Sequence, residues 1–159
     1  MRGSFNSKEW AAIPLRLIVG YGFMEHGYAK FVKGPEWFAN ILQALHVPAP
    51  HMMAWLTILV ELFGGAAVLT GDFIRVASIP MVAVLLVAMF SVHLRYGFSS
   101  IKLMAITPTG ARLGSAGIEP DLFYIACLVA LVLGGSGPFA IDNQLAVIHK
   151  KPNNLSRAT

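Results

Sequence analysis

The sequence predicts an all-α integral membrane protein, a four-helix bundle with a short interfacial helix between its first two spans. Of the 159 residues, 56% are hydrophobic and 13% are charged, whereas charged residues make up about a quarter of a typical soluble domain. The apolar stretches are continuous rather than alternating, which favours helices over a barrel, and lipid tolerates only these two structures. The basic residues are spread between the apolar stretches as membrane-flanking anchors, so we expect no nucleic-acid partner.

Four apolar segments predict the spans, because about 20 apolar residues cross the hydrocarbon core of a bilayer. Turn residues and charges bound each segment. The four segments extend from Trp10 to Val32, from His51 to Thr70, from Phe73 to Tyr96 and from Pro120 to Leu133.

The length of the chain allows one compact bundle. We therefore expect a single transmembrane domain over residues 1–149 and a polar, disordered tail over residues 150–159. An even number of spans places both termini on one side of the membrane. The slight excess of Lys and Arg on that side predicts cytoplasmic termini.

Two segments between the predicted spans have different characters. Glu36 to His46 carries apolar residues at helical spacing but is too short to cross, which indicates an interfacial helix. Gly97 to Glu119 is long and mixed in composition, and we expect a loop there. Loops of that length are often functional, docking surfaces included.

Ionisable residues inside spans are the first place to look for function, because they are costly unless they face a partner or water. At about 100° per residue, Arg16 and Lys30 share a face of the first span with Gly20 and Gly27, and His26 lies at its border. We expect this small and polar face to point into the bundle. By depth, His26, Lys30 and His93 should lie toward the first loop, and Arg16 toward the termini.

Glu61 is close to mid-membrane in the second span, beside Gly64 and Gly65. Small residues let a neighbouring helix approach closely, so we expect Glu61 to face the first span. Its nearest basic partner should be Arg16 or His26, one to two turns away on either side. A carboxylate in such a place suits a structural ion pair, and it equally suits binding a quinone headgroup or relaying its protons.

Metal and thiol chemistry are less favoured. His26 and His93 could ligate a metal or haem, but they lack the Glu-x-x-His spacing and the CxxCH motif that identify such sites. We predict no metal. Cys127 is the only cysteine, so one chain can form neither a disulfide nor a redox pair.

Several short motifs, in order along the chain, resemble the DoxX family of small bacterial membrane proteins. The motifs that carry the resemblance are RLIVG at 16–20 and HGYAK at 26–30, VELFGG at 60–65 with LTG at 69–71 and Arg75, then His93, GIE at 117–119 and GSGPFAID at 135–142.

This resemblance implies a four-helix fold in the bacterial cytoplasmic (inner) membrane. Family members resemble the small membrane subunit of thiosulfate:quinone oxidoreductase, and others occur in oxidoreductase or oxidative-stress assemblies. With one cysteine, this chain departs from the relatives that perform thiol-disulfide exchange.

The leading hypothesis is a membrane subunit of an oxidoreductase complex that handles a quinone or its protons, with the electron donor site on a partner protein. Glu61, His26 and His93 are the candidate catalytic residues, and Arg16 and Lys30 the candidate ligand-binding residues. Any enzymatic role would be that of a quinone-linked subunit that needs this partner.

Two other readings stay open. One is a non-catalytic membrane scaffold or assembly protein whose long loop docks a partner. The other is a small-solute transporter, which the absence of an inverted repeat disfavours. The small-residue faces would also permit a homo-oligomer.

Overall fold

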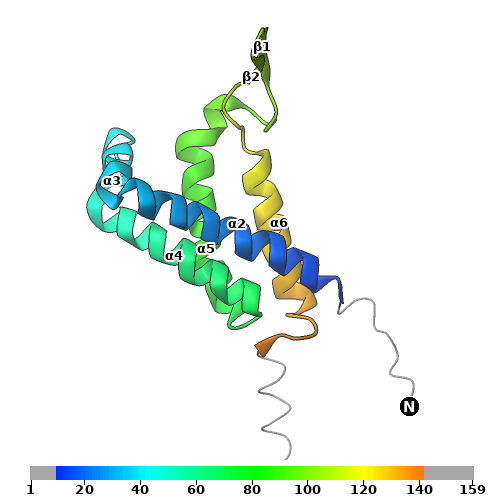
Figure 1. The fold of residues 1–159 in the computed structure, drawn as a ribbon. Coiled ribbons are helices and arrows are strands. Elements are labelled where there is room, and N and C mark those ends of the chain that lie inside the picture. The colour runs from blue at the N-terminus through cyan, green and yellow to red at the C-terminus, as the bar shows by residue number, and fades with distance from the viewer. Residues whose placement is uncertain (1–9, 142–159) are drawn as a thin grey trace, which may run out of the picture.

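The computed structural model describes residues 10–141, and most of them are helical (Figure 1). The elements follow the order α2 (Ala12–Lys33), α3 (Pro35–Ala44), α4 (Pro50–Thr70), α5 (Ile74–Ala88), the π-helix η1 (Met89–His93), the 3₁₀ turn η2 (Leu94–Tyr96), β1 (Leu103–Thr107), β2 (Gly110–Leu113) and α6 (Glu119–Gly134). The expected tail over residues 150–159 lies outside the described residues.

Proline and glycine fix the ends of several helices. Pro35 and Pro50 begin α3 and α4, where the missing N–H would have no helical partner. Gly71 ends α4 in the left-handed region, at φ 77°, and its N–H bonds the carbonyls of the last turn. Pro80, which the sequence predicts near the first turns of its helix, lies in the second turn of α5.

Two helices are long and apolar enough to cross a membrane: α4, and the continuous helical stretch Ile74–Tyr96 that joins α5, η1 and η2. The segment α2 has 22 residues but carries four charges, and α6 has 16 residues. Helices therefore occur at all four predicted spans and at the predicted interfacial segment.

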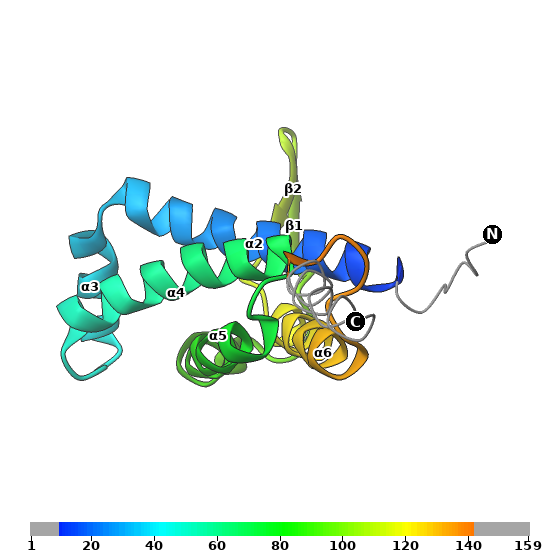
Figure 2. The same cartoon turned by 90° about the horizontal axis from the view of Figure 1, so that it is seen from below.

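The bundle consists of two crossed helix pairs. Seen from below, α2 and α4 lie side by side and pass across α5 and α6, which are viewed nearly along their axes (Figure 2). The main core fills the space between the pairs, and α3 packs on α4 through a separate small cluster. The side chains at the centre of the main core include Val19, Val68, Met81, Leu128 and Leu131.

The segment from 97 to 119 is not the open loop that the sequence predicts. It contains an antiparallel hairpin of β1 and β2 that projects from the bundle where α5 ends and α6 begins (Figure 1). The base of the hairpin is closed by backbone hydrogen bonds from Gly117 N to Ser99 O and from Ile118 N to Gly97 O, each 3.0 Å. Buried and exposed residues do not alternate along these strands, because every residue of both strands is exposed.

Candidate functional site

The face of α2 that carries Gly20 and Gly27 packs against α4, as predicted, and the two helices are antiparallel. A Cβ added to Gly20 would lie 2.8 Å from Gly65 O, and one added to Gly27 would lie 3.0 Å from the Glu61 Cβ. The helices therefore touch backbone to backbone, which only glycine permits. These contacts set the register that decides which charged side chains can meet.

Glu61 faces α2, as expected, but its predicted partner is wrong. The Lys30 ammonium donates to both carboxylate oxygens of Glu61 at 2.7 Å. The side chain of Glu61 is 7% exposed and that of Lys30 is 22% exposed. The pair is therefore closed on the Glu61 side and partly open on the Lys30 side.

The direction of the side chains explains this partner. Side chains on a helix lean toward its N-terminus. Because α2 and α4 are antiparallel, Glu61 leans toward the first loop, and Lys30 leans back to the level of Gly27, where Glu61 begins. Arg16 leans away from both, and it is fourteen residues from Lys30, about 21 Å along the axis.

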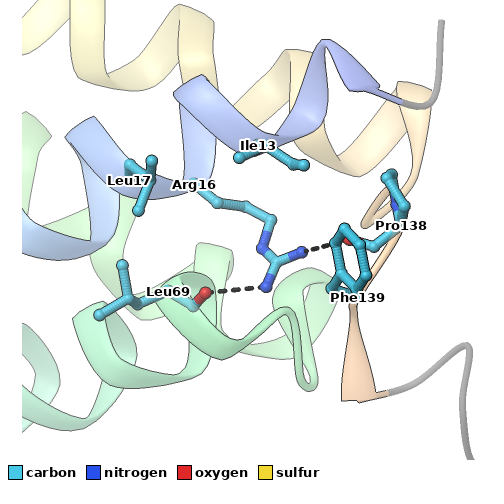
Figure 3. A pocket seen from close by; sticks show the side chains of 6 residues that line it. All are labelled: Ile13, Arg16, Leu17, Leu69, Pro138 and Phe139. Atoms are coloured by element: carbon cyan, nitrogen blue, oxygen red, sulfur yellow. Dashed lines mark hydrogen bonds between the residues drawn. The ribbon is translucent and has the colours of Figure 1, made fainter. Parts of the chain in front are cut away.

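Arg16 binds backbone carbonyls at the other end of the bundle. Its guanidinium donates to Val68 O and Leu69 O at the end of α4, at 3.2 and 2.8 Å. It also donates to Ser136 O and Pro138 O after α6, at 3.0 and 3.2 Å. Figure 3 shows the guanidinium between these two segments, beside a small pocket. Arg16 is thus a structural tie between α2, the C-terminal end of α4 and the segment after α6.

Gly71 belongs to the same arrangement. A Cβ at this position would lie 2.7 Å from the Arg16 guanidinium carbon and 2.8 Å from the Ala140 Cβ. Near this end, the Trp10 and Phe139 rings pack edge to face, 5.8 Å apart. The two ends of the described chain therefore meet at the Arg16 end of the bundle, in agreement with an even number of crossings.

A second polar contact lies at the opposite end. His93 Nδ1 is 2.6 Å from Asp121 Oδ2, and the Asp121 side chain is 6% exposed. His93 is the last residue of the π-helical turn η1, a feature often found at functional sites. The sequence analysis did not single out Asp121, although a carboxylate at the second residue of a predicted span was a usable signal.

His26 connects these two contacts. Its residue is exposed, on the side of α2 next to Gly27, and its ring packs on Tyr124 at 6.4 Å. Lys30, Asp121 and His93 lie in its neighbourhood. The predicted gathering of His26, Lys30 and His93 toward one end is confirmed. Together with Glu61, Asp121 and Tyr124 these residues form what we call the loop-end cluster.

An apolar pocket of about 230 Å³ lies beside the cluster, between α2 and α6. Tyr124 lines it and also covers Gly22, where the added Cβ would collide with the phenol oxygen. Within the described residues, no three His, Cys, Asp or Glu side chains are grouped to hold a metal. The residues that line the pocket are Ile18, Val19, Pro120, Phe123, Tyr124 and Cys127.

The GIE segment before α6 has a structural use. Ser100 donates to Glu119 Oε2 from its backbone N–H at 2.7 Å and from its hydroxyl at 2.6 Å. These hydrogen bonds lower the pKa of Glu119. Gly117 packs directly against the carbonyls of Gly97 and Phe98, where any side chain would collide. The segment therefore fastens the base of the hairpin to the start of α6.

Comparison with known proteins identifies the family of the chain. The chain is 28% identical over 143 residues to an uncharacterized membrane protein of Mycobacterium tuberculosis, covering 86% of this chain and 82% of that protein. No solved structure matches the chain significantly. Residues 11–94, more than half of the chain, match the DoxX family. The matched part contains Arg16, Lys30, Glu61 and His93. The chain is therefore a membrane protein that belongs to the DoxX family.

Proposed function

We propose that this chain is a four-helix membrane subunit of an oxidoreductase complex, and that its loop-end cluster binds a quinone headgroup and exchanges protons with it. The observation that carries the proposal is the pairing of two buried carboxylates, Glu61 with Lys30 and Asp121 with His93, at one end of an apolar bundle. Ionisable groups are expensive inside a membrane, so they point to function there.

The residues of the cluster fit a quinone chemically. A bound quinone supplies an acceptor for two electrons and two protons. Lys30 can donate a hydrogen bond to a carbonyl oxygen from its partly open side. His26, on the same helix, and His93, at the end of η1, can do so as well. Glu61 and Asp121 hold these donors in place and can exchange protons with them. The apolar pocket beside Tyr124 suits the ring or tail of such a ligand.

The proposal revises the roles inferred from the sequence. Lys30, rather than Arg16, orients Glu61, and Asp121 joins the site as the partner of His93. Arg16 leaves the ligand-binding set, because four of its N–H donors are used by main-chain oxygens. Electrons come from a partner protein, since a single cysteine cannot cycle between dithiol and disulfide within one chain.

The proposal includes a membrane topology. We place all four helices α2, α4, α5 and α6 across the bacterial inner membrane, with the Arg16 end and both termini on the cytoplasmic side. The packing of Trp10 on Phe139 supports placing both ends of the bundle domain together. Attachment of a reporter protein to either terminus, with reporter activity restricted to one compartment, tests this orientation.

The functional test is quinone content and turnover. Wild-type protein purified in mild detergent should retain quinone in an organic extract, and Glu61→Gln should lose it along with quinone-dependent turnover of the co-purified complex. Glu36→Gln is the matched control, because Glu36 is 73% exposed and bonds only His51 on the surface. Absence of quinone from the wild type, with unchanged turnover in Glu61→Gln, would refute the proposal.

A non-catalytic scaffold is the second candidate function. It is favoured by the use of Arg16, Gly20, Gly65 and Gly71 for packing alone. On this account Glu61→Ala lowers the amount of assembled complex, while each assembled complex keeps its redox turnover. Turnover normalised to assembled complex separates the two functions.

A further inference from the structure

We propose that the hairpin formed by β1 and β2 is a membrane-surface anchor, whose apolar face inserts into the headgroup region of a leaflet that contains anionic lipid. The proposal goes beyond the quinone site and does not depend on it. It rests on the sidedness of the hairpin, its charge and its position relative to the helices.

The hairpin is two-faced because of one irregularity. Leu103 pairs with Leu113, and Ile106 pairs with Ala111, but a register shift falls between Leu103 and Ala105. Paired residues share a face and neighbouring residues on a strand alternate. The shift therefore brings Leu103 and Ile106 to the same face, which a regular strand would separate.

The resulting faces differ in chemistry. The first carries Leu103, Ile106, Ala111 and Leu113, and the opposite face carries Ala105 with Arg112 and the polar end of the hairpin. Ile106 is 81% exposed, and Leu103 and Leu113 are 59% and 60% exposed. An isolated two-stranded hairpin is marginal in water, so an apolar face of this kind calls for a covering surface.

The charge of the segment selects an anionic surface. Residues 97–118 contain Lys102 and Arg112 and no acidic residue, and Arg95 precedes them. Both Arg95 and Lys102 lie over the ring of Tyr96, at 4.9 and 6.0 Å. Tyr together with Lys and Arg is the usual composition where a helix leaves the membrane, and basic residues bind anionic headgroups.

The hairpin rises beyond the end of α6 in Figure 1 and also leans outward past α2 in Figure 2, so a leaflet beside the helices can reach its outer part. In Figure 2, which looks nearly along α5 and α6, the hairpin extends past α2 and beyond the outline of the helices. Its base is fixed at Tyr96, the end of a helix long enough to cross the membrane. The bilayer around that helix is therefore continuous with the space below the hairpin. A protein that added a strand would use the backbone edges and would not require one apolar face.

Spin-label accessibility in the full-length protein tests the proposal. In a Cys127→Ser background, one label is attached at Ile106→Cys and a matched label at Ala105→Cys, on the opposite face. The protein is reconstituted at low protein-to-lipid ratio in phosphatidylcholine with or without phosphatidylglycerol. We expect the first label to favour collisions with oxygen, and the second to favour collisions with a water-soluble nickel chelate.

Charge removal gives the second measurement. Lys102→Gln and Arg112→Gln should each lower the ratio of inserted to free hairpin about fivefold in the anionic bilayer, with little change in pure phosphatidylcholine. Equal nickel access at both positions would overturn the proposal. The proposal would also be overturned if the label at position 106 were protected from nickel only at high protein density or after addition of a partner subunit. That result would show that another protein, and not lipid, covers the apolar face.

Discussion

The two ends of the bundle use the same kind of residue in opposite ways. At one end the cation Arg16 is buried, and among the described residues its hydrogen bonds go to backbone oxygens. At the other end Lys30, on the same helix, binds a carboxylate and keeps part of its side chain open. A backbone carbonyl does not take up a proton from the cation that it binds, whereas a carboxylate can. The partner of a charged side chain, rather than the charge itself, therefore distinguishes a packing residue from a candidate site.

The largest effect should come from the packing end. Arg16→Met removes four hydrogen bonds from a charged donor and leaves their buried and part-buried carbonyls without it, so we expect the free energy of unfolding to fall by about 3–5 kcal/mol. Thermal unfolding of the purified protein in detergent measures the loss. Arg95→Met is the control, because Arg95 is exposed and contacts only the Tyr96 ring. Equal losses in both variants would contradict the role of Arg16.

The second-largest effect should come from disturbing the contact between α2 and α4. This contact sets the register of the two helices and thereby keeps Arg16 apart from Glu61. Gly65→Ala would place a Cβ 2.7 Å from Gly20 O and 2.9 Å from the Met24 N. We expect a loss of about 1–3 kcal/mol in unfolding free energy. Gly134→Ala on α6 meets nothing within 4 Å and should cost nothing measurable. A Gly65→Ala protein as stable as wild type would show that the helices are not in close contact.

Loss of one partner at the loop end should destabilise less than Arg16→Met and about as much as Gly65→Ala. Glu61→Gln weakens a bond to a partly open Lys30, and we expect a loss of about 1.5–3 kcal/mol, below that of Arg16→Met. Lys30→Met and the double variant complete a double-mutant cycle, with unfolding free energy as the readout. Additive losses would mean that the two side chains do not interact.

The fastening of the hairpin should give the smallest effect. The pKa of Glu119 is lowered by its bonds from Ser100, so this contact stabilises the fold above the ordinary glutamate pKa and is lost only as the pH falls through the lowered value. Hydrogen exchange of the Ser100 amide should stay slow at mildly acidic pH in the wild type and become fast in Glu119→Gln. If the Ser100 amide exchanges equally slowly in Glu119→Gln, its hydrogen bond to the Glu119 carboxylate does not fasten the hairpin.

The sequence predicted the helices well because their signals are local. Apolar length, proline at helix starts and Gly71 at a helix end depend on neighbours in the chain. The face of α2 that carries Gly20 and Gly27 was also predictable from helical periodicity.

Partners across helices were harder to predict because they depend on register. The level at which α2 meets α4 follows from the contact of Gly20 with Gly65, which no single helix reveals. The expected depth of Glu61 in the membrane predicted Arg16 or His26 as its partner. The directions in which the Glu61 and Lys30 side chains lean bring these two together instead. Asp121 was missed because its partner, His93, is 28 residues away in sequence. The hairpin was missed because its exposed strands do not alternate regularly.

Affinity for a short-chain quinone analogue tests the central claim most directly. The analogue is titrated into detergent-purified wild type, Glu61→Gln and the surface control Glu36→Gln, and the Kd is measured for each. If the loop-end cluster binds the headgroup, Glu61→Gln weakens binding about tenfold or more, as expected for a lost charged hydrogen bond, and Glu36→Gln leaves it unchanged. The same Kd in all three proteins, or no binding to the wild type, would contradict the account.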